Sequence, residues 1–195
     1  MAKVIRLVKQ YKWAEFFQEY DDKTGYKGPQ WLNVGGVAVF NLDGMPKITS
    51  KGEFQKIFDF KADKCSVEFR DLPDTFDFER YQEGEMQEEP MKVTIGTNDD
   101  VLRIFQFYNG NTRGSIMVRT ALLEPFAGNE EIMYTVRKSA NGTPYLCVMD
   151  GLLLAAIILP YTPTYERKQA IKHEIELVVK ELERSLAWDR VNAKQ

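Results

Sequence analysis

The sequence is poor in the residue types that hold metals or form disulfide frameworks. Its 195 residues include two cysteines and one histidine. Cys65 and Cys147 are far apart and form no Cys-x-x-Cys pair, so cysteine and histidine ligands for zinc cannot be assembled. One disulfide between them is conceivable, but isolated buried thiols are favoured, because free cysteine behaves as a small hydrophobe in a reducing compartment. We therefore predict no metal site.

Long hydrophobic runs are also missing. The most apolar stretch, residues 152–160, is nine residues long, whereas a membrane-spanning helix needs about 20. Residues 1–9 are too short and too interrupted by charge to form the apolar part of a signal peptide. We therefore expect a cytoplasmic protein that has no membrane partner.

The common catalytic motifs are absent as well. The sequence contains no P-loop, no dinucleotide-binding Gly-x-Gly-x-x-Gly, no Gly-x-Ser-x-Gly, no His-Glu-x-x-His and no kinase signature. The single histidine, His173, lies about 200° around a predicted helix from Ile171, on the polar face. A nucleophile activated by histidine is therefore not expected, and we predict no catalytic residue, no cofactor and no enzymatic activity.

What the sequence does contain is an ordinary globular mixture. Hydrophobic residues make up 44%, aromatic residues 12% and charged residues 28%, which is typical of a folded chain. A length of 195 residues suits one domain with a sizeable core. We predict a single domain over residues 1–195.

The N-terminal half shows a mixture of helix and strand patterns. Residues 3–9 fit a strand and 11–20 a short helix, although one continuous helix over 3–20 is also compatible. Residues 31–42 and 66–72 fit strands, and the glycine pair at 35–36 indicates a bulge or a close backbone approach. Ser50 and Glu53 have capping-box spacing, which predicts a helix beginning at residue 51.

The second half reads as a β-meander. Asn-Gly at 109–110 and 141–142 and Asp-Gly at 150–151 are strong hairpin signals. A competing interpretation makes 99–108 a helix capped by Asn98. The predicted strands are residues 92–96, 101–108, 115–122, 132–138, 145–149 and 152–159.

The chain closes with a predicted amphipathic helix over about 164–190. One narrow face is apolar and the opposite face carries charges of both signs. This stripe either packs on the protein's own sheet or pairs with a second copy or a partner. It consists of Ile171, Ile175, Val178, Leu182 and Leu186.

Together these patterns predict an α+β fold. Its largely antiparallel sheet would form a β-meander in the second half, with two short helices in the N-terminal half and the long C-terminal helix at the end.

Charge is unevenly distributed along the chain. Residues 71–89, the acidic segment, hold eight acids against Arg80 alone, a net charge of −7, within a chain whose net charge is −3. The segment has no sustained period, so we expect an exposed loop over about 71–90. It fits a solvated loop, a partner-binding surface that imitates phosphate charge, or a divalent-cation site. The acids are Asp71, Asp74, Asp77, Glu79, Glu83, Glu85, Glu88 and Glu89, of which all but Asp71 form the predicted partner-binding set.

A second candidate surface combines basic and aromatic residues of successive strands. If Arg103, Arg119 and the pair Arg137-Lys138 share a face with neighbouring aromatics, they resemble a platform for single-stranded nucleic acid. The alternative is that the aromatics form the core and the arginine stems cover its rim.

Three functional classes remain. The preferred one is a non-catalytic interaction protein that binds another protein through the acidic segment, the terminal helix or both, such as a small acidic inhibitor or adaptor of phage or mobile-element type acting on a host or nucleic-acid-handling protein. The second is a single-stranded nucleic-acid-binding accessory protein. The third is a carboxylate or divalent-metal enzyme that uses the acidic segment, and it is the least supported.

Overall fold

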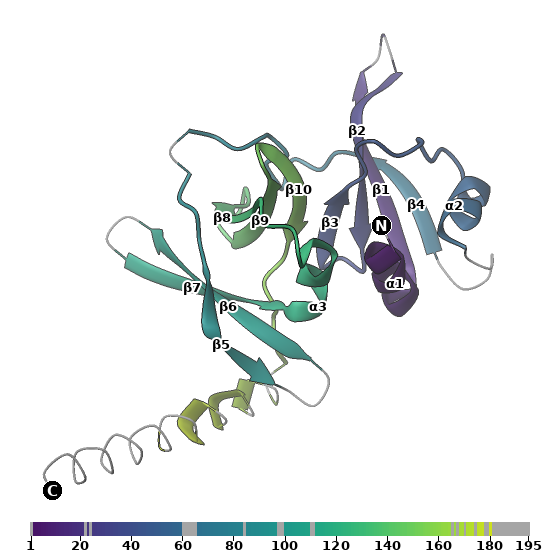
Figure 1. The fold of residues 1–195 in the computed structure, drawn as a ribbon. Coiled ribbons are helices and arrows are strands. Elements are labelled where there is room, and N and C mark those ends of the chain that lie inside the picture. Colours follow the sequence, from purple (N-terminus) through teal and green to yellow (C-terminus); the bar gives the residue numbers. More distant parts are fainter. Residues whose placement is uncertain are drawn as a thin grey trace, which may run out of the picture.

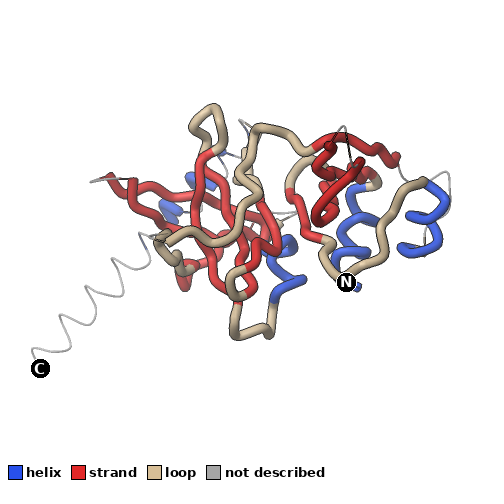
Figure 2. Tube along the Cα trace, turned by 90° about the horizontal axis from the view of Figure 1, so that it is seen from above, coloured by secondary structure: helices blue, strands red, loops and turns tan. Residues whose placement is uncertain are grey.

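The computed structural model describes most of the chain. Its described residues are 2–21, 23, 25–59, 66–83, 85–96, 100–109, 112–164, 166, 168–169, 171–173, 175–177 and 180. Figure 1 shows the arrangement of the elements, and Figure 2 shows from above that strands occupy most of the length of the molecule, with short helices beside them.

The predicted fold class is wrong in its main architectural points. The strands form a mixed seven-stranded sheet in the order β4-β1-β2-β3-β10-β9-β8 and a separate three-stranded sheet in the order β5-β6-β7. The second half is therefore not one meander, because its strands divide between two sheets. The seven-stranded sheet is mixed because β1 (Trp13–Asp21) pairs in parallel with β4 (Ser66–Asp71).

The seven-stranded sheet joins strands from both halves of the chain. β2 (Gly25–Val34) and β3 (Ala38–Asn41) form a hairpin, and β3 then pairs with β10 (Leu153–Ile158). β9 (Pro144–Asp150) and β8 (Ile132–Lys138) complete the sheet by antiparallel pairing. The pairing of β3 with β10 is thus the seam between the two halves.

The beginning of the chain differs from both sequence interpretations. Residues Ala2–Tyr11 form the helix α1, and 13–20 belong to the strand β1 rather than to a helix. Gly35 and Gly36 form the turn between β2 and β3 instead of a bulge. A Cβ on Gly35 would lie 2.4 Å from the Tyr11 ring, and the φ of this glycine is +60°, so both space and backbone require glycine there.

The helix α2 (Lys51–Phe58) confirms the capping prediction. Ser50 is its N-cap, and the Ser50 side chain accepts a hydrogen bond from the Glu53 N–H. The Glu53 carboxylate in turn accepts from the Thr49 N–H and hydroxyl, and these bonds lower its pKa. The buried side chains of α2, Phe54 and Phe58, face the core, so the polar cap and the apolar face together fix this helix.

Two apolar clusters lie on opposite faces of the seven-stranded sheet. The first face packs against α1, α2, α3 (Thr120–Leu123) and the three-stranded sheet of β5 (Pro90–Gly96), β6 (Val101–Asn109) and β7 (Thr112–Arg119). The short helical turn η1 (Glu124–Phe126) follows α3 and also contributes to this face. The second face presents a separate cluster, in which the sheet contributes Phe17, Trp31, Val39, Tyr145, Cys147, Met149, Leu154 and Ile157.

The long C-terminal helix is not seen among the described residues. The residues described between 166 and 180 are helical, but 167, 170, 174, 178, 179 and 181–190 lie outside the described residues. Ile171 is buried with Ile95, Leu102 and Tyr161. Ile175 is exposed, while Val178, Leu182 and Leu186 lie outside the described residues. Of the five residues of the predicted apolar stripe, the structure therefore describes only the first two.

Candidate functional site

The acidic segment follows the second face of the seven-stranded sheet, where its own apolar residues cover the cluster. Leu72, Phe76, Phe78 and Tyr81 pack against that cluster. Phe78 meets Trp31 with ring centroids 4.9 Å apart, and Phe76 meets Tyr145 at 5.3 Å. The described residues between 72 and 89 contain no helix or strand, so this segment is a loop, as predicted, but one that forms part of the core.

A buried arginine fixes the middle of the acidic segment. Arg137, on the edge strand β8, is 9% exposed. Its Nε donates to Glu85 Oε1 at 2.7 Å, and its Nη2 lies 2.6 Å from the same oxygen. The remaining donors reach the main-chain carbonyls of Asp77 (3.2 Å), Glu79 (2.9 Å) and Arg80 (2.8 Å). One guanidinium therefore holds the loop through a carboxylate and three carbonyls.

Main-chain hydrogen bonds tie the same segment to the sheet at further points. The Glu88 N–H donates to the Tyr134 carbonyl at 2.7 Å on the outer edge of β8. The Tyr81 N–H donates to the Leu152 carbonyl at 3.3 Å in the turn before β10. The Ala140 N–H donates to the Thr75 carbonyl at 3.1 Å. Figure 1 shows the segment passing across this end of the sheet toward β5.

Tyr145 provides one more polar contact beneath the segment. Its hydroxyl accepts a hydrogen bond from the Asp77 N–H at 3.0 Å. Burial raises the pKa of Tyr145 to about 12, so the hydroxyl stays neutral near pH 7 and accepts through a lone pair.

The eight acids divide into outward and inward groups. Glu85 is half-buried against Arg137, and Asp77 is half-buried with its carboxylate 3.7 Å from the same guanidinium. Glu88 is buried, and burial raises the pKa of its carboxyl. The exposed acids are Asp71, Asp74, Glu79, Glu83 and Glu89. The partner-binding set predicted from the sequence thus loses three members to the interior and keeps its exposed ones on one anchored loop.

The predicted nucleic-acid face is not brought together. Arg103 on β6 and Lys138 on β8 are exposed, but they belong to different sheets. The Nε of Arg119 lies 3.1 Å from Asp100 Oδ2, and its guanidinium lies 4.8 Å from the centre of the Tyr161 ring. Arg137 is occupied beneath the acidic segment, so both Arg119 and Arg137 are already engaged within the chain.

An open hollow that the sequence does not predict lies beside the acidic segment. Its volume is about 440 Å³. Leu153, on its wall, is 47% exposed, and the adjacent Leu152 is 67% exposed. The apolar run 152–159 predicts a core strand along its whole length. The only sequence feature that could indicate exposure of its first residues is their position directly after the Asp-Gly turn. The lining residues are Pro29, Trp31, Asn41, Asp43, Phe78, Glu79, Arg80, Leu153 and Leu154.

A second polar cluster lies at the other end of the sheet, where it pairs a buried carboxylate with side chains of neighbouring strands. Glu15 is buried on β1, and its carboxylate receives Arg70 Nε at 2.7 Å and Asn33 Nδ2 at 3.0 Å. Arg70 also contacts Glu68 at 2.7 Å, and that hydrogen bond together with attraction to Glu15 raises the pKa of Arg70. The buried carboxylate is thus paired across neighbouring strands.

The potential metal ligands and nucleophiles of the described part of the chain do not gather into one site. No three His, Cys, Asp or Glu side chains gather there as a metal site would require. Cys147 is fully buried in β9, and burial raises its pKa to about 12, so its thiol is neutral near pH 7 and poorly nucleophilic. Cys65 lies outside the described residues, and His173 is exposed.

The comparisons with known proteins add no relative. The chain matches no protein-family model, no curated protein and no solved structure. Within the described residues, no helix combines the length and apolarity needed to cross a membrane. The candidate site therefore rests on the acidic segment, its arginine anchor and the adjacent hollow.

Proposed function

We propose that the chain is a non-catalytic protein-interaction module whose acidic segment binds a basic surface of a partner protein. The observation that carries this proposal is the anchoring of the segment by buried Arg137, which leaves Glu79, Glu83 and Glu89 exposed on the same loop. A loop that served only as a solvated connection would not need a buried guanidinium to hold it.

Anchoring matters because ordering a loop on binding costs free energy. A flexible acidic loop would lose conformational entropy when it docks, whereas a loop already held in place loses less. Its fixed carboxylates can then complement a basic patch, steer the encounter and set the register of the complex. These are the requirements of a binding surface rather than of a catalytic site.

The proposal extends to the kind of partner. Carboxylates spaced along a loop imitate the charge of a phosphate backbone, so a protein that handles nucleic acid offers the matching basic surface. A small inhibitor or adaptor of phage or mobile-element type, acting on such a host protein, fits this chemistry.

The test reverses exposed charges without disturbing the anchor. The double variant Glu83→Lys and Glu89→Lys changes two outward side chains, whereas Glu85 and Glu88 stay because they lie inside. The matched control, Glu166→Lys and Glu176→Lys, makes the same charge change in the C-terminal part of the chain. Partners are captured from cells of the source organism, identified by mass spectrometry and measured in purified form.

We expect the acidic-segment variant to lose affinity for the partner by about 100-fold or more, because like charges placed opposite each other cost several kcal/mol. The control variant should bind as the wild type does. Equal binding by both variants would contradict the proposal. Circular dichroism and melting curves establish that each variant is folded.

No observation favours the two alternative functions. A nucleic-acid platform would need Arg119 and Arg137 available on one face, and both are engaged within the chain. A carboxylate or metal enzyme would need the acids of the segment to converge, but they divide between an exposed and an inward-facing group.

A further inference from the structure

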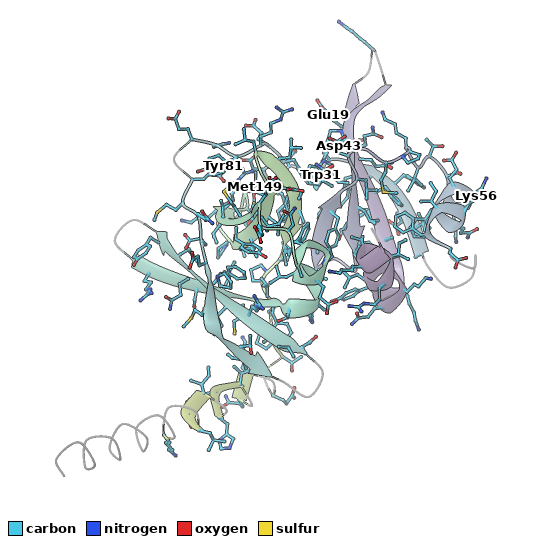
Figure 3. All side chains as sticks on the ribbon, viewed as in Figure 1. Glu19, Trp31, Asp43, Lys56, Tyr81 and Met149 are labelled. Atoms are coloured by element: carbon cyan, nitrogen blue, oxygen red, sulfur yellow. The ribbon has the colours of Figure 1, made fainter. Side chains whose placement is uncertain are left out.

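The hollow beside the acidic segment has both walls and charges suited to a peptide. Phe78 and the exposed Leu153 supply the apolar surface, and Trp31, which meets Phe78 edge to face at 4.9 Å, and Leu154 are buried beneath it. Its volume of about 440 Å³ falls within the range of sites that take a small ligand or a few side chains. Figure 3 labels Trp31 and Asp43 close together, and Trp31 lies on β2 opposite Asn41, the last residue of β3.

The loop and the sheet that form the two walls of the hollow are each held in place by their own hydrogen bonds. Phe78, Glu79 and Arg80 belong to the loop that Arg137 holds through the carbonyls of residues 79 and 80. On the sheet side, the Asn41 side chain donates to the Leu154 carbonyl at 2.9 Å and so links β3 to β10. The hollow is thus formed before any partner arrives, and binding need not first order its walls.

The charged residues of the hollow favour a cation. Asp43 and Glu79 are exposed and line it, and Arg80 is the third charged residue of the lining. Two carboxylates against one guanidinium give the lining a negative balance of charge. An apolar wall edged by carboxylates is complementary to a side chain such as leucine or phenylalanine beside a lysine or arginine.

We infer that this hollow binds an extended segment of the partner protein in which an apolar side chain stands next to lysine or arginine. The apolar side chain contacts Phe78, Leu153 and the adjacent exposed Leu152, while the cation lies between Asp43 and Glu79. The inference rests on the proposed interaction function and names the part of the partner that is recognised.

The experiment uses the full-length chain and synthetic peptides. Fluorescein-labelled nonapeptides carry a central leucine or phenylalanine, flanked on each side by two lysines or, in the matched set, by two glutamates. Binding is followed by fluorescence anisotropy at low and high salt. We expect the lysine-flanked peptides to bind, the glutamate-flanked ones not to bind, and the affinity to fall as salt screens the exposed charges.

Variants locate the binding in the hollow. Glu79→Lys, Asp43→Lys and Leu153→Asp should each weaken the lysine-flanked peptides by about tenfold or more, whereas the control Glu166→Lys should leave them unchanged. Arg80→Gln removes the single positive lining charge and should strengthen binding severalfold. Asp43 is exposed in a turn, so its variant keeps the test decisive even if Leu153→Asp fails to fold.

The outcomes separate this inference from the proposed function. The inference is overturned if lysine- and glutamate-flanked peptides bind equally, if neither binds, or if the three hollow variants bind as the wild type does. If the Glu83 and Glu89 reversals abolish capture of the natural partner but the hollow variants do not, the interaction function stands and the hollow inference falls. If the hollow variants alone abolish capture, the hollow inference stands and the outward acidic surface is not the contact.

Discussion

Burying the guanidinium of Arg137 costs free energy unless its donors find acceptors and its charge finds a partner. Glu85 supplies the opposite charge, and the carbonyls of residues 77, 79 and 80 accept the remaining donors. These groups depend on one another. Removing the guanidinium would leave the half-buried Glu85 carboxylate without its opposite charge and three carbonyls without this donor.

Replacing Arg137 tests whether the guanidinium and its acceptors stabilise the fold together. Arg137→Ala should lower the free energy of unfolding by about 3–5 kcal/mol, the usual cost of breaking a buried ion pair from one side. Denaturant unfolding measures the loss. Arg6→Ala is the matched control, because the Arg6 side chain is exposed and pairs with Glu124 at the surface, so its loss should cost at most about 1 kcal/mol. Equal losses in the two variants would show that Arg137 does not anchor the segment.

The sequence identifies the residue types of the candidate site, but it does not show which of the side chains point into the protein. Arg137 and Lys138 are adjacent on a strand, so one points inward and the other outward, and nothing local shows which. The inward position of Arg137 depends on Glu85, more than fifty residues earlier in the chain. The sequence does not distinguish the buried Glu88 from its exposed neighbours for the same reason, since burial of a loop residue depends on what lies beneath the loop.

At the level of elements, the acidic segment is rich in charged residues, yet its apolar side chains cover part of the sheet. Phe76, Phe78 and Tyr81 alternate with acids and cover the second face of the sheet, while the main chain at Glu88 pairs with the edge of β8. This pairing also covers part of an edge strand, which would otherwise present unpaired donors and acceptors.

The pH dependence of stability should report the burial of Glu88. Because burial raises its pKa in the folded chain, the folded state binds this proton more tightly than the unfolded state, whose glutamate pKa is about 4.3. The ionised carboxylate therefore destabilises the fold at neutral pH, and this cost is absent below the unfolded pKa. Glu88→Gln should raise the melting temperature at pH 7, with the gain shrinking as the pH falls toward about 4.

The neighbouring residue provides the control for this titration. Glu89 is exposed, so Glu89→Gln should produce a melting temperature whose difference from the wild type varies little over the same pH range. A Glu88→Gln gain that stays constant with pH would contradict the titration argument.

At the level of elements, the sequence succeeded where signals are local. Ser50 and Glu53 fixed the start of α2, and turn residues located β8, β9 and β10 to within about two residues. It failed at 11–20 because β1 buries residues of both faces, including Phe16 and Phe17. A strand buried on both faces shows no alternation, so its aromatics fitted a helical spacing equally well.

For the whole molecule, the missing information is long-range pairing. The turn signals correctly suggested hairpins, but they say nothing about which hairpins share a sheet. Whether β7 continues to β8 in one meander or gives way to a second sheet depends on contacts such as β3 with β10, which join residues more than one hundred positions apart. The parallel pair β1 and β4 likewise has no local signature.

The seam between β3 and β10 determines whether the two halves unfold together. Ile157 is fully buried on β10 and pairs with Val39 of β3, and the Leu159 N–H donates to the Val37 carbonyl at 2.9 Å. If this seam couples the halves, Ile157→Ala should lower the stability of both by about 2–5 kcal/mol. In a background of Cys65→Ser and Trp188→Phe, tryptophan fluorescence from Trp13 and Trp31 reports the first half.

Labelling of the Cys147 thiol on β9, which is fully buried in the folded chain, reports the second half in the same samples. We expect the two probes to give coincident denaturant transitions, both before and after Ile157→Ala, because the strands share one sheet and one apolar cluster spans the seam. A variant in which the Cys147 transition moves while the tryptophan transition stays would instead show two independently folding units. The predicted single domain over residues 1–195 would then be wrong.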